Sequence, residues 1–312
     1  MRLSRRDFVP AAALALAATV LPRFARAVPG GARGPNAHHD DAAELDRLRE
    51  WVGVLREEKL AARGRPIGPA VARVGELALG APYAAGTLDA YAKAGSVDLT
   101  VVEPLTVSLL RFDCVTLVES CLAVARLARR GGNPTWTRFE RAITTLRYRD
   151  GQRGAYPSRL HYFSDWMADN ARRGTVRTLG RTLGGSVDPR PLRFMTTHRA
   201  SYPALAGNSA FDAIARQERR LDRVPRRVIP TAQLDVLAPR FRTGDVLAFA
   251  TAIEGLDVTH TGLAWRDPAG VLRVLHAPLS GGVVQTSAGT LREYVAGLKR
   301  CTGILAARPL PD

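Results

Sequence analysis

The sequence predicts an α+β protein in which helices come first and an antiparallel sheet follows. Most segments with apolar residues at helical spacing precede most of the short runs that are rich in β-branched and apolar residues. The turn at residues 266–270 joins two such runs directly, as in a β-hairpin. This order differs from the regular alternation of strand and helix that indicates a parallel sheet. With 312 residues and 46% hydrophobic content, the chain can form one substantial core.

The first 27 residues have the pattern of an export signal. Residues 4–9 form a twin-arginine motif, residues 11–21 are apolar, and residues 25–27, Ala-Arg-Ala, match a cleavage site. The apolar run is too short to span a bilayer. We therefore expect export by the twin-arginine pathway, a periplasmic or other extracytoplasmic location, and no stable membrane insertion after the signal is cleaved. An uncleaved N-terminal anchor is the alternative.

The remaining chain is expected to form one domain behind a flexible tail. Residues 28–41 are rich in Gly, Pro and Ala, which is typical of a mobile segment. Residues 42–312 then form a single domain, which we expect to be monomeric.

The chain is strongly basic, with a formal charge of +16 that comes almost entirely from arginine. The arginines are scattered along the sequence, whereas a nucleic-acid footprint requires a concentrated basic face. We expect no nucleic-acid partner. The basic surface is better suited to an anionic polymer.

The expected elements follow the spacing of apolar residues and the helix caps. The helices are expected at residues 42–62, 67–79, 114–130, 136–147, 158–174 and 209–224, with a short one opened by the capping box Thr290–Glu293. The strands are expected at residues 105–110, 175–183, 191–195, 246–250, 258–265, 271–277, 283–286 and 301–307.

Cys114 occupies the most informative position in the chain. Asp113 is a favourable N-cap residue, so Cys114 should open a largely buried helix. A thiol there meets the positive end of the helix dipole, and we expect its pKa to be lowered. The first-turn N–H groups can also stabilise an oxyanion. By position alone, a small buried core cysteine fits equally well.

Two histidines flank the predicted hairpin at equal distances from Pro268. His260 lies eight residues before it and His276 eight residues after it, so we expect them to face each other across the strands. Facing Cβ atoms are roughly 5 Å apart. A bulge would separate the two, and each His alone is more often structural. A thiol with two such imidazoles supplies a nucleophile, a base and a group that orients the base.

Tyr83 and His161 are weaker candidates for the same site. Tyr83 projects from a tight loop of Gly and Pro at residues 80–87, although a packing role is as compatible. His161 and Asp165 are i, i+4 neighbours in an expected helix, where they can pair in a substrate groove or on the surface.

The three cysteines leave at least one thiol free. We expect Cys121 to be a core residue, and the sequence does not decide whether it forms a disulfide with Cys301.

Together these residues resemble the NlpC-type branch of the papain-fold cysteine hydrolases, which cut bacterial peptidoglycan. The matching segments are, in chain order, residues 80–87, 113–114, 243–245, 260–263 and 276–277. A narrower group of N-acetylmuramoyl-L-alanine amidases, once described only as a domain of unknown function, is similar at residues 159–166, 193–195 and 254–260. The resemblance spans about residues 42–309.

The resemblance implies a papain-like fold with the nucleophile helix packed on an antiparallel sheet and extra helices around it. It implies that Cys114 is the nucleophile, His260 the general base and His276 the polar third member. It also implies that Tyr83 and Asp113 line the substrate site, to which we add His161 as a candidate. One departure is Val115, which stands where the family often has a small hydroxyl residue.

The expected activity is hydrolysis of the amide between N-acetylmuramic acid and L-alanine, with peptidoglycan or muropeptides as partner, no cofactor and no metal. The nearest alternative is an endopeptidase that uses the same residues to cut the stem peptide after γ-D-glutamate. A zinc hydrolase with Cys114, His260 and His276 as ligands and a non-catalytic wall-binding protein are further alternatives.

Overall fold

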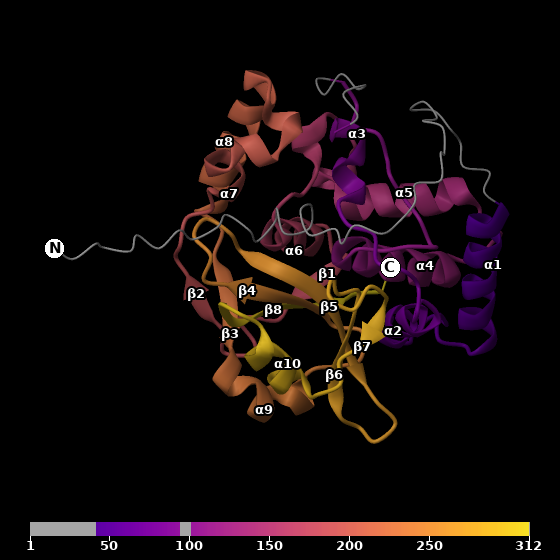
Figure 1. The fold of residues 1–312 in the computed structure, drawn as a ribbon. Coiled ribbons are helices and arrows are strands. Elements are labelled where there is room, and N and C mark those ends of the chain that lie inside the picture. Colours follow the sequence, from indigo (N-terminus) through magenta and orange to yellow (C-terminus); the bar gives the residue numbers. More distant parts are fainter. Residues whose placement is uncertain (1–41, 94–100, 312) are drawn as a thin grey trace, which may run out of the picture.

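The computed structural model describes residues 42–93 and 101–311, where helices surround one antiparallel sheet (Figure 1). The α-helices are α1 (Ala42–Glu57), α2 (Gly68–Leu77), α3 (Ala90–Lys93), α4 (Cys114–Arg130), α5 (Trp136–Arg147), α6 (Phe163–Arg172), α7 (Phe194–Thr197), α8 (Asn208–Leu221), α9 (Leu234–Leu237) and α10 (Leu291–Gly297). The strands are β1 (Val176–Thr178), β2 (Ser186–Asp188), β3 (Arg226–Pro230), β4 (Val246–Thr251), β5 (Val258–Arg266), β6 (Leu272–His276), β7 (Gln285–Thr286) and β8 (Cys301–Pro309).

The sheet has the order β2-β3-β8-β4-β5-β6-β7, β1 also pairs with β8, and every pairing is antiparallel. The predicted α+β class is confirmed. The expected signal peptide and tail lie outside the described residues.

Alternate residues of the central strands face two different hydrophobic cores. On β4, Val246 and Ala248 belong to the core formed with α1, α2, α4 and α5. Leu247 and Phe249 belong to the core formed with α9 and α10. This alternation is the period-two pattern of a strand covered on both sides.

Helix α4 is the central element of the larger core, and every residue from Thr116 to Ala128 is buried. Its one buried carboxylate, Glu119, accepts a hydrogen bond from Arg147 Nε at 2.7 Å and another from Trp166 Nε1 at 3.2 Å. Burial raises the pKa of Glu119, and the charge of Arg147 opposes this effect. The bond with Arg147 links α4 to α5, and the bond with Trp166 links α4 to α6.

The expected strand at residues 105–110 is wrong, because side chains satisfy its backbone in place of a neighbouring strand. Glu44 of α1 accepts hydrogen bonds from Leu109 N at 2.5 Å and from Ser108 Oγ at 2.6 Å. Arg147 donates to the carbonyl of Thr106 at 2.5 Å. The segment is therefore extended but belongs to no sheet.

Two further boundaries differ from expectation. Ser158 does not cap a helix, since its Oγ accepts a hydrogen bond from Gly154 N and helix α6 begins only at Phe163. The expected strand at residues 191–195 is also wrong, because Phe194 opens the short helix α7. Strand β3 was not predicted, because its sequence, Arg-Arg-Val-Ile-Pro, has no alternating pattern. The strand forms through its pairing with β2 and β8.

All three cysteines are free thiols. Cys121 is fully buried in the α4 core, as expected, whereas Cys301 packs against the core on the other side of the sheet. The Cys121–Cys301 disulfide is therefore not formed.

None of the helices in the described ranges combines the length and the apolar character needed to cross a membrane.

We expect Arg147→Ala to destabilise the fold by about 3 to 5 kcal/mol, because it leaves the Glu119 carboxylate buried without its ionic partner. Arg141→Ala, on the exposed side of the same helix, is the matched control. Urea unfolding of the two variants measures the difference. Equal stability of both variants would show that Glu119 does not depend on Arg147.

Candidate active site

The start of α4 is fixed by a capping box around Asp113. Asp113 Oδ1 accepts hydrogen bonds from Val115 N at 3.0 Å and Thr116 N at 2.7 Å. In return, Thr116 Oγ1 accepts from Asp113 N at 2.9 Å. The prediction that Cys114 opens the helix is confirmed.

Strand β5 meets the helix at this residue. Thr261 Oγ1 donates a hydrogen bond to the carbonyl oxygen of Cys114 at 2.8 Å. Thr261 directly follows His260, so the backbone of His260 lies near the first turn of α4, while the two adjacent side chains leave the strand on opposite faces. Both Cys114 and His260 are partly exposed and therefore accessible from solvent.

The expected lowering of the thiol pKa is wrong. Burial raises the pKa of Cys114 to about 11, the negative charge of Asp113 adds to this, and the N–H and hydroxyl of Thr261 oppose it only in part. Burial is thus the main reason for the difference, and the N-cap adds to it because Asp113 already accepts the N–H groups of Val115 and Thr116. The thiol is therefore neutral at neutral pH in the free protein.

The two histidine rings meet, although not through the expected register. Leu263 pairs with Leu275 and Arg266 with Leu272, which shifts the hairpin by two residues from a turn centred on Pro268. A shift of two preserves the face on which each side chain lies. His260 Nε2 and His276 Nδ1 are 2.8 Å apart, with the ring planes at 74°.

Gly262 makes this approach possible. A Cβ atom at Gly262 would come within 2.9 Å of the Leu275 carbonyl oxygen and 3.1 Å of His276 Cβ. Any larger residue would push β6 and its histidine away from β5.

Both imidazoles are neutral at neutral pH. Burial lowers the pKa of His260 to about 3, with a smaller contribution from His276, and burial lowers the pKa of His276 to about 4. Since Nε2 of His260 faces His276, its Nδ1 is the nitrogen left for another partner.

Two aromatic residues that sequence reasoning missed complete this cluster. Phe249 stacks on His260 with ring centroids 5.7 Å apart. Tyr294 of α10 reaches His276, with its hydroxyl 3.2 Å from Nδ1. Burial, followed by the negative charge of a Cys114 thiolate, raises the pKa of Tyr294. The Thr290 capping box indicated the helix but not the face on which it packs.

The loop that carries Tyr83 lies beside the entry to α4, and the role of Tyr83 in the substrate site stays a prediction. Its N–H donates to Gly282 O at 2.8 Å, and the next residue donates to Phe112 O at 2.9 Å, so the loop spans the entry to α4 and the segment after His276. Burial and then the charges of Cys114 and Asp113 raise the pKa of the Tyr83 phenol. Asp113 Oδ2 accepts a hydrogen bond from Thr87 Oγ1 at 3.4 Å, which ties this loop to the N-cap.

The expected pairing of His161 with Asp165 is wrong. His161 precedes α6, its Nε2 is 2.9 Å from the carbonyl oxygen of Tyr156, and Asp165 pairs with Arg149. Burial lowers the pKa of His161 to about 3. No hydrogen bond within the described ranges links His161 to the cluster around Cys114, so its role as a substrate-binding residue stays a prediction.

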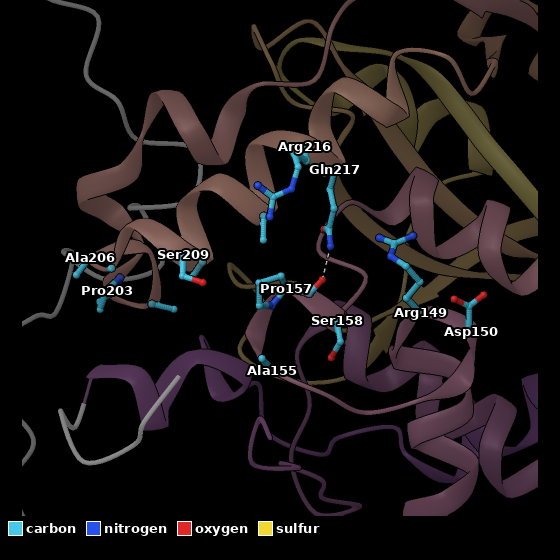
Figure 2. Close-up of a pocket in the computed structure, with 14 residues that line it drawn as sticks. Arg149, Asp150, Ala155, Pro157, Ser158, Pro203, Ala206, Ser209, Arg216 and Gln217 are labelled. Atoms are coloured by element: carbon cyan, nitrogen blue, oxygen red, sulfur yellow. Dashed lines mark hydrogen bonds between the residues drawn. The ribbon is translucent and has the colours of Figure 1, made fainter. Parts of the chain in front are cut away.

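A cavity of about 780 Å³ lies elsewhere, between α8 and the segments that precede α6 and α8 (Figure 2). Its polar groups are largely bonded to protein. Gln217 donates to the carbonyl oxygen of Pro157, Arg149 pairs with Asp165, and Asp150 pairs with Arg172. None of the residues that line it belongs to the Cys114 cluster.

The geometry does not favour a zinc site. In the part of the chain that the structure describes, no three His, Cys, Asp or Glu side chains are grouped to hold a metal ion. His260 Nε2 and His276 Nδ1 face each other at 2.8 Å, too close to hold between them an ion whose bonds to nitrogen are about 2.0 to 2.1 Å each.

The sequence model of the AmiA-like family, described as N-acetylmuramoyl-L-alanine amidase-like, matches residues 73–304. Among curated proteins, no match was found.

Several solved structures are similar in fold to this chain. An N-acetylmuramoyl-L-alanine amidase from Bacteroides uniformis ATCC 8492 is 27% identical, with a TM-score of 0.70 over 78% of this chain and 99% of that chain. A putative xylanase from Bacteroides fragilis is 31% identical, with a TM-score of 0.67 over 75% of this chain and 99% of that chain. Protein LPG0564 from Legionella pneumophila, 18% identical with a TM-score of 0.62 over 88% and 97%, shares the fold.

The raised pKa of Cys114 predicts how alkylation depends on pH. Because the thiolate is the reactive form, the rate of iodoacetamide modification should rise steadily from pH 6 to pH 10. Mass spectrometry of the modified peptide gives the rate, and Cys114→Ala reports the background from Cys301. A rate that is constant down to pH 5 would show instead a preformed thiolate–imidazolium pair.

The lowered histidine pKa values predict a loss of stability in acid. Above about pH 6.5 the imidazoles are neutral in both folded and unfolded chains. Below it, the unfolded chain takes up protons that His260 and His276 accept only near pH 3 to 4, so unfolding becomes more favourable as pH falls.

We therefore expect His276→Gln to show a smaller fall in melting temperature between pH 7 and pH 4 than the wild type. His198→Gln removes a histidine outside the cluster and is the control. A slope in His276→Gln as steep as in the wild type would contradict the linkage.

Proposed function

The chain belongs to the AmiA-like family of N-acetylmuramoyl-L-alanine amidase-like proteins, and from this premise we propose that it is a peptidoglycan amidase whose nucleophile is Cys114. The observation that carries the proposal is the junction of α4 and β5. A hydrogen bond joins the carbonyl of Cys114, at the N-terminus of α4, to Thr261, the residue that follows His260, and His260 is in turn 2.8 Å from His276. Cys114 and the two histidines lie 146 or more residues apart in the sequence.

The proposal includes the NlpC-like variant of the papain fold. In support, the helix that Cys114 opens packs on an antiparallel sheet, and two neighbouring strands of that sheet carry His260 and His276. The helices α5 to α8 lie between this helix and strand β4 in the sequence and form the additional layer.

The substrate is peptidoglycan or a muropeptide, and the scissile bond is the amide between the lactyl group of N-acetylmuramic acid and L-alanine. The thiol and both imidazoles are neutral in the free protein. The proton of Cys114 therefore moves to His260 as sulfur attacks the lactyl carbonyl carbon, not beforehand. His260 Nδ1 is the acceptor, because its Nε2 is engaged with His276.

The tetrahedral oxyanion needs hydrogen-bond donors at the helix start. Among the described residues, the backbone N–H of Cys114 donates to no oxygen, so it is free to bind the oxyanion. The phenol of Tyr83, whose loop is held across the entry to the helix, is our candidate for a second donor.

Collapse of the intermediate breaks the C–N bond, and His260 returns the proton to the L-alanine nitrogen. The products are a thioester on Cys114 and a free stem peptide. His260 then takes a proton from water, whose oxygen attacks the thioester carbon, and the proton passes to sulfur as the thiol leaves. Each cycle consumes one water and restores the neutral site.

The xylanase-like relative does not change this assignment. Glycoside hydrolysis requires two carboxyl groups on either side of the scissile bond. In this cluster the carboxylate is Asp113, whose Oδ1 is committed to the N-cap of α4. Sulfur and imidazole chemistry therefore fits the site better.

We further propose that the protein acts outside the cytoplasm, in line with the twin-arginine motif of residues 4–9. Peptidoglycan lies in that compartment.

Cys114→Ala should abolish the release of free stem peptide from muropeptides, lowering kcat by at least about 10³-fold, because no other group replaces the nucleophile. Cys301→Ser, which removes a thiol at the far side of the sheet, should retain activity. Mass spectrometry of the digest identifies the products.

The same digest separates the two candidate reactions. Intact stem peptides together with peptide-free sugars identify the amidase. Dipeptides left on the sugar identify the endopeptidase that cuts after γ-D-glutamate. Undiminished release by Cys114→Ala would overturn the assignment of the nucleophile.

A further inference from the structure

We propose that Tyr294 is a positioning residue of this site: its hydroxyl donates a hydrogen bond to His276 Nδ1 and so holds His276 in the tautomer that accepts a hydrogen bond from His260. The inference rests on the proposed function of the Cys114 site. It assigns a role to a residue of α10, outside the three residues that perform the reaction.

The tautomer matters because a neutral imidazole carries one proton. His260 can take the thiol proton on Nδ1 only if its own proton sits on Nε2. That N–H must then donate to His276 Nδ1, 2.8 Å away. In the opposite arrangement, His276 Nδ1–H donates to His260, the proton of His260 sits on Nδ1, and the base is lost.

Tyr294 favours the first arrangement, in which His276 Nδ1 carries no proton. Its oxygen lies 3.2 Å from His276 Nδ1, and within the described ranges its hydroxyl has no other hydrogen-bond partner. When Nδ1 is unprotonated, its lone pair accepts from His260 Nε2–H at 2.8 Å and, as the longer arm of a three-centre hydrogen bond, from the phenol at 3.2 Å. When Nδ1 carries the proton, the phenol proton loses its acceptor in the protein. Within the described ranges, His276 Nε2 is buried without a hydrogen-bond partner.

The phenol is held in place by the helix that carries it. A capping box fixes the start of α10, where Thr290 Oγ1 accepts from Glu293 N at 3.2 Å and Thr290 N donates to Glu293 Oε2 at 2.8 Å. Leu291 and Val295, three residues before Tyr294 and one after it, are buried and anchor the helix on the sheet.

Contacts with neighbouring rings restrict the orientation of the Tyr294 side chain. The Tyr294 ring lies 4.9 Å from that of His276 at 76°, and 5.2 Å from that of Phe249 at 62°. Phe249 in turn stacks on His260. The four rings form one cluster, in which the phenol oxygen is directed at Nδ1.

The test is a measurement of histidine tautomers by NMR on the full chain labelled with ¹⁵N-histidine. In the wild type, His276 should carry its proton on Nε2 and show an unprotonated Nδ1. Tyr294→Phe keeps the ring and removes only the hydroxyl. In this variant the Nδ1–H form of His276 should gain population, and kcat for muropeptide cleavage should fall roughly fivefold to tenfold with KM unchanged, the scale of one neutral hydrogen bond.

The control is Tyr202→Phe, which removes a phenol hydroxyl from a different hydrophobic cluster and should change neither measurement. A proton on Nδ1 of wild-type His276 would overturn the proposal without any variant. So would a fall in kcat of Tyr294→Phe with an unchanged tautomer, or a changed tautomer with unchanged kcat. Because the tautomer is read without substrate, failure of the amidase assignment would appear separately, as a wild-type chain that releases no stem peptide.

Discussion

The contact between the first turn of α4 and strand β5 is the interaction on which the site depends. A single hydrogen bond from Thr261 to the Cys114 carbonyl joins the helix that Cys114 opens to the strand that carries His260. On one side, α4 is fixed by its burial and by the ion pair of Glu119 with Arg147. On the other side, β5 is fixed by pairing with β4 and β6. The site is thus supported by the two most constrained parts of the fold.

Burial determines the electrostatics of this junction more than the helix dipole does. The pKa of Cys114 is raised and those of His260 and His276 are lowered, each with burial as its first cause. The resting site therefore holds three neutral groups rather than an ion pair. In the proposed reaction, charge develops only as sulfur attacks, when a substrate can supply compensating contacts.

The expected hairpin was wrong in register, and the expectation that His260 and His276 meet was nevertheless confirmed. Moving the pairing register by two residues leaves His260 and His276 on the same face, because side chains alternate with period two. They become diagonal neighbours, and Gly262 leaves the space in which the rings meet. A one-residue error would have placed them on opposite faces.

Local chemistry in the sequence determined the elements that carry the site. Asp113 before an apolar periodic run specifies the start of α4, and Thr290 with Glu293 specifies the start of α10, since caps are satisfied within one turn. Only the tertiary structure decided which groups face each other. Tyr294 reached His276, His161 was left outside the cluster, and Cys114 became a neutral thiol. These outcomes depend on burial and on contacts between segments far apart in the chain, which no local pattern encodes.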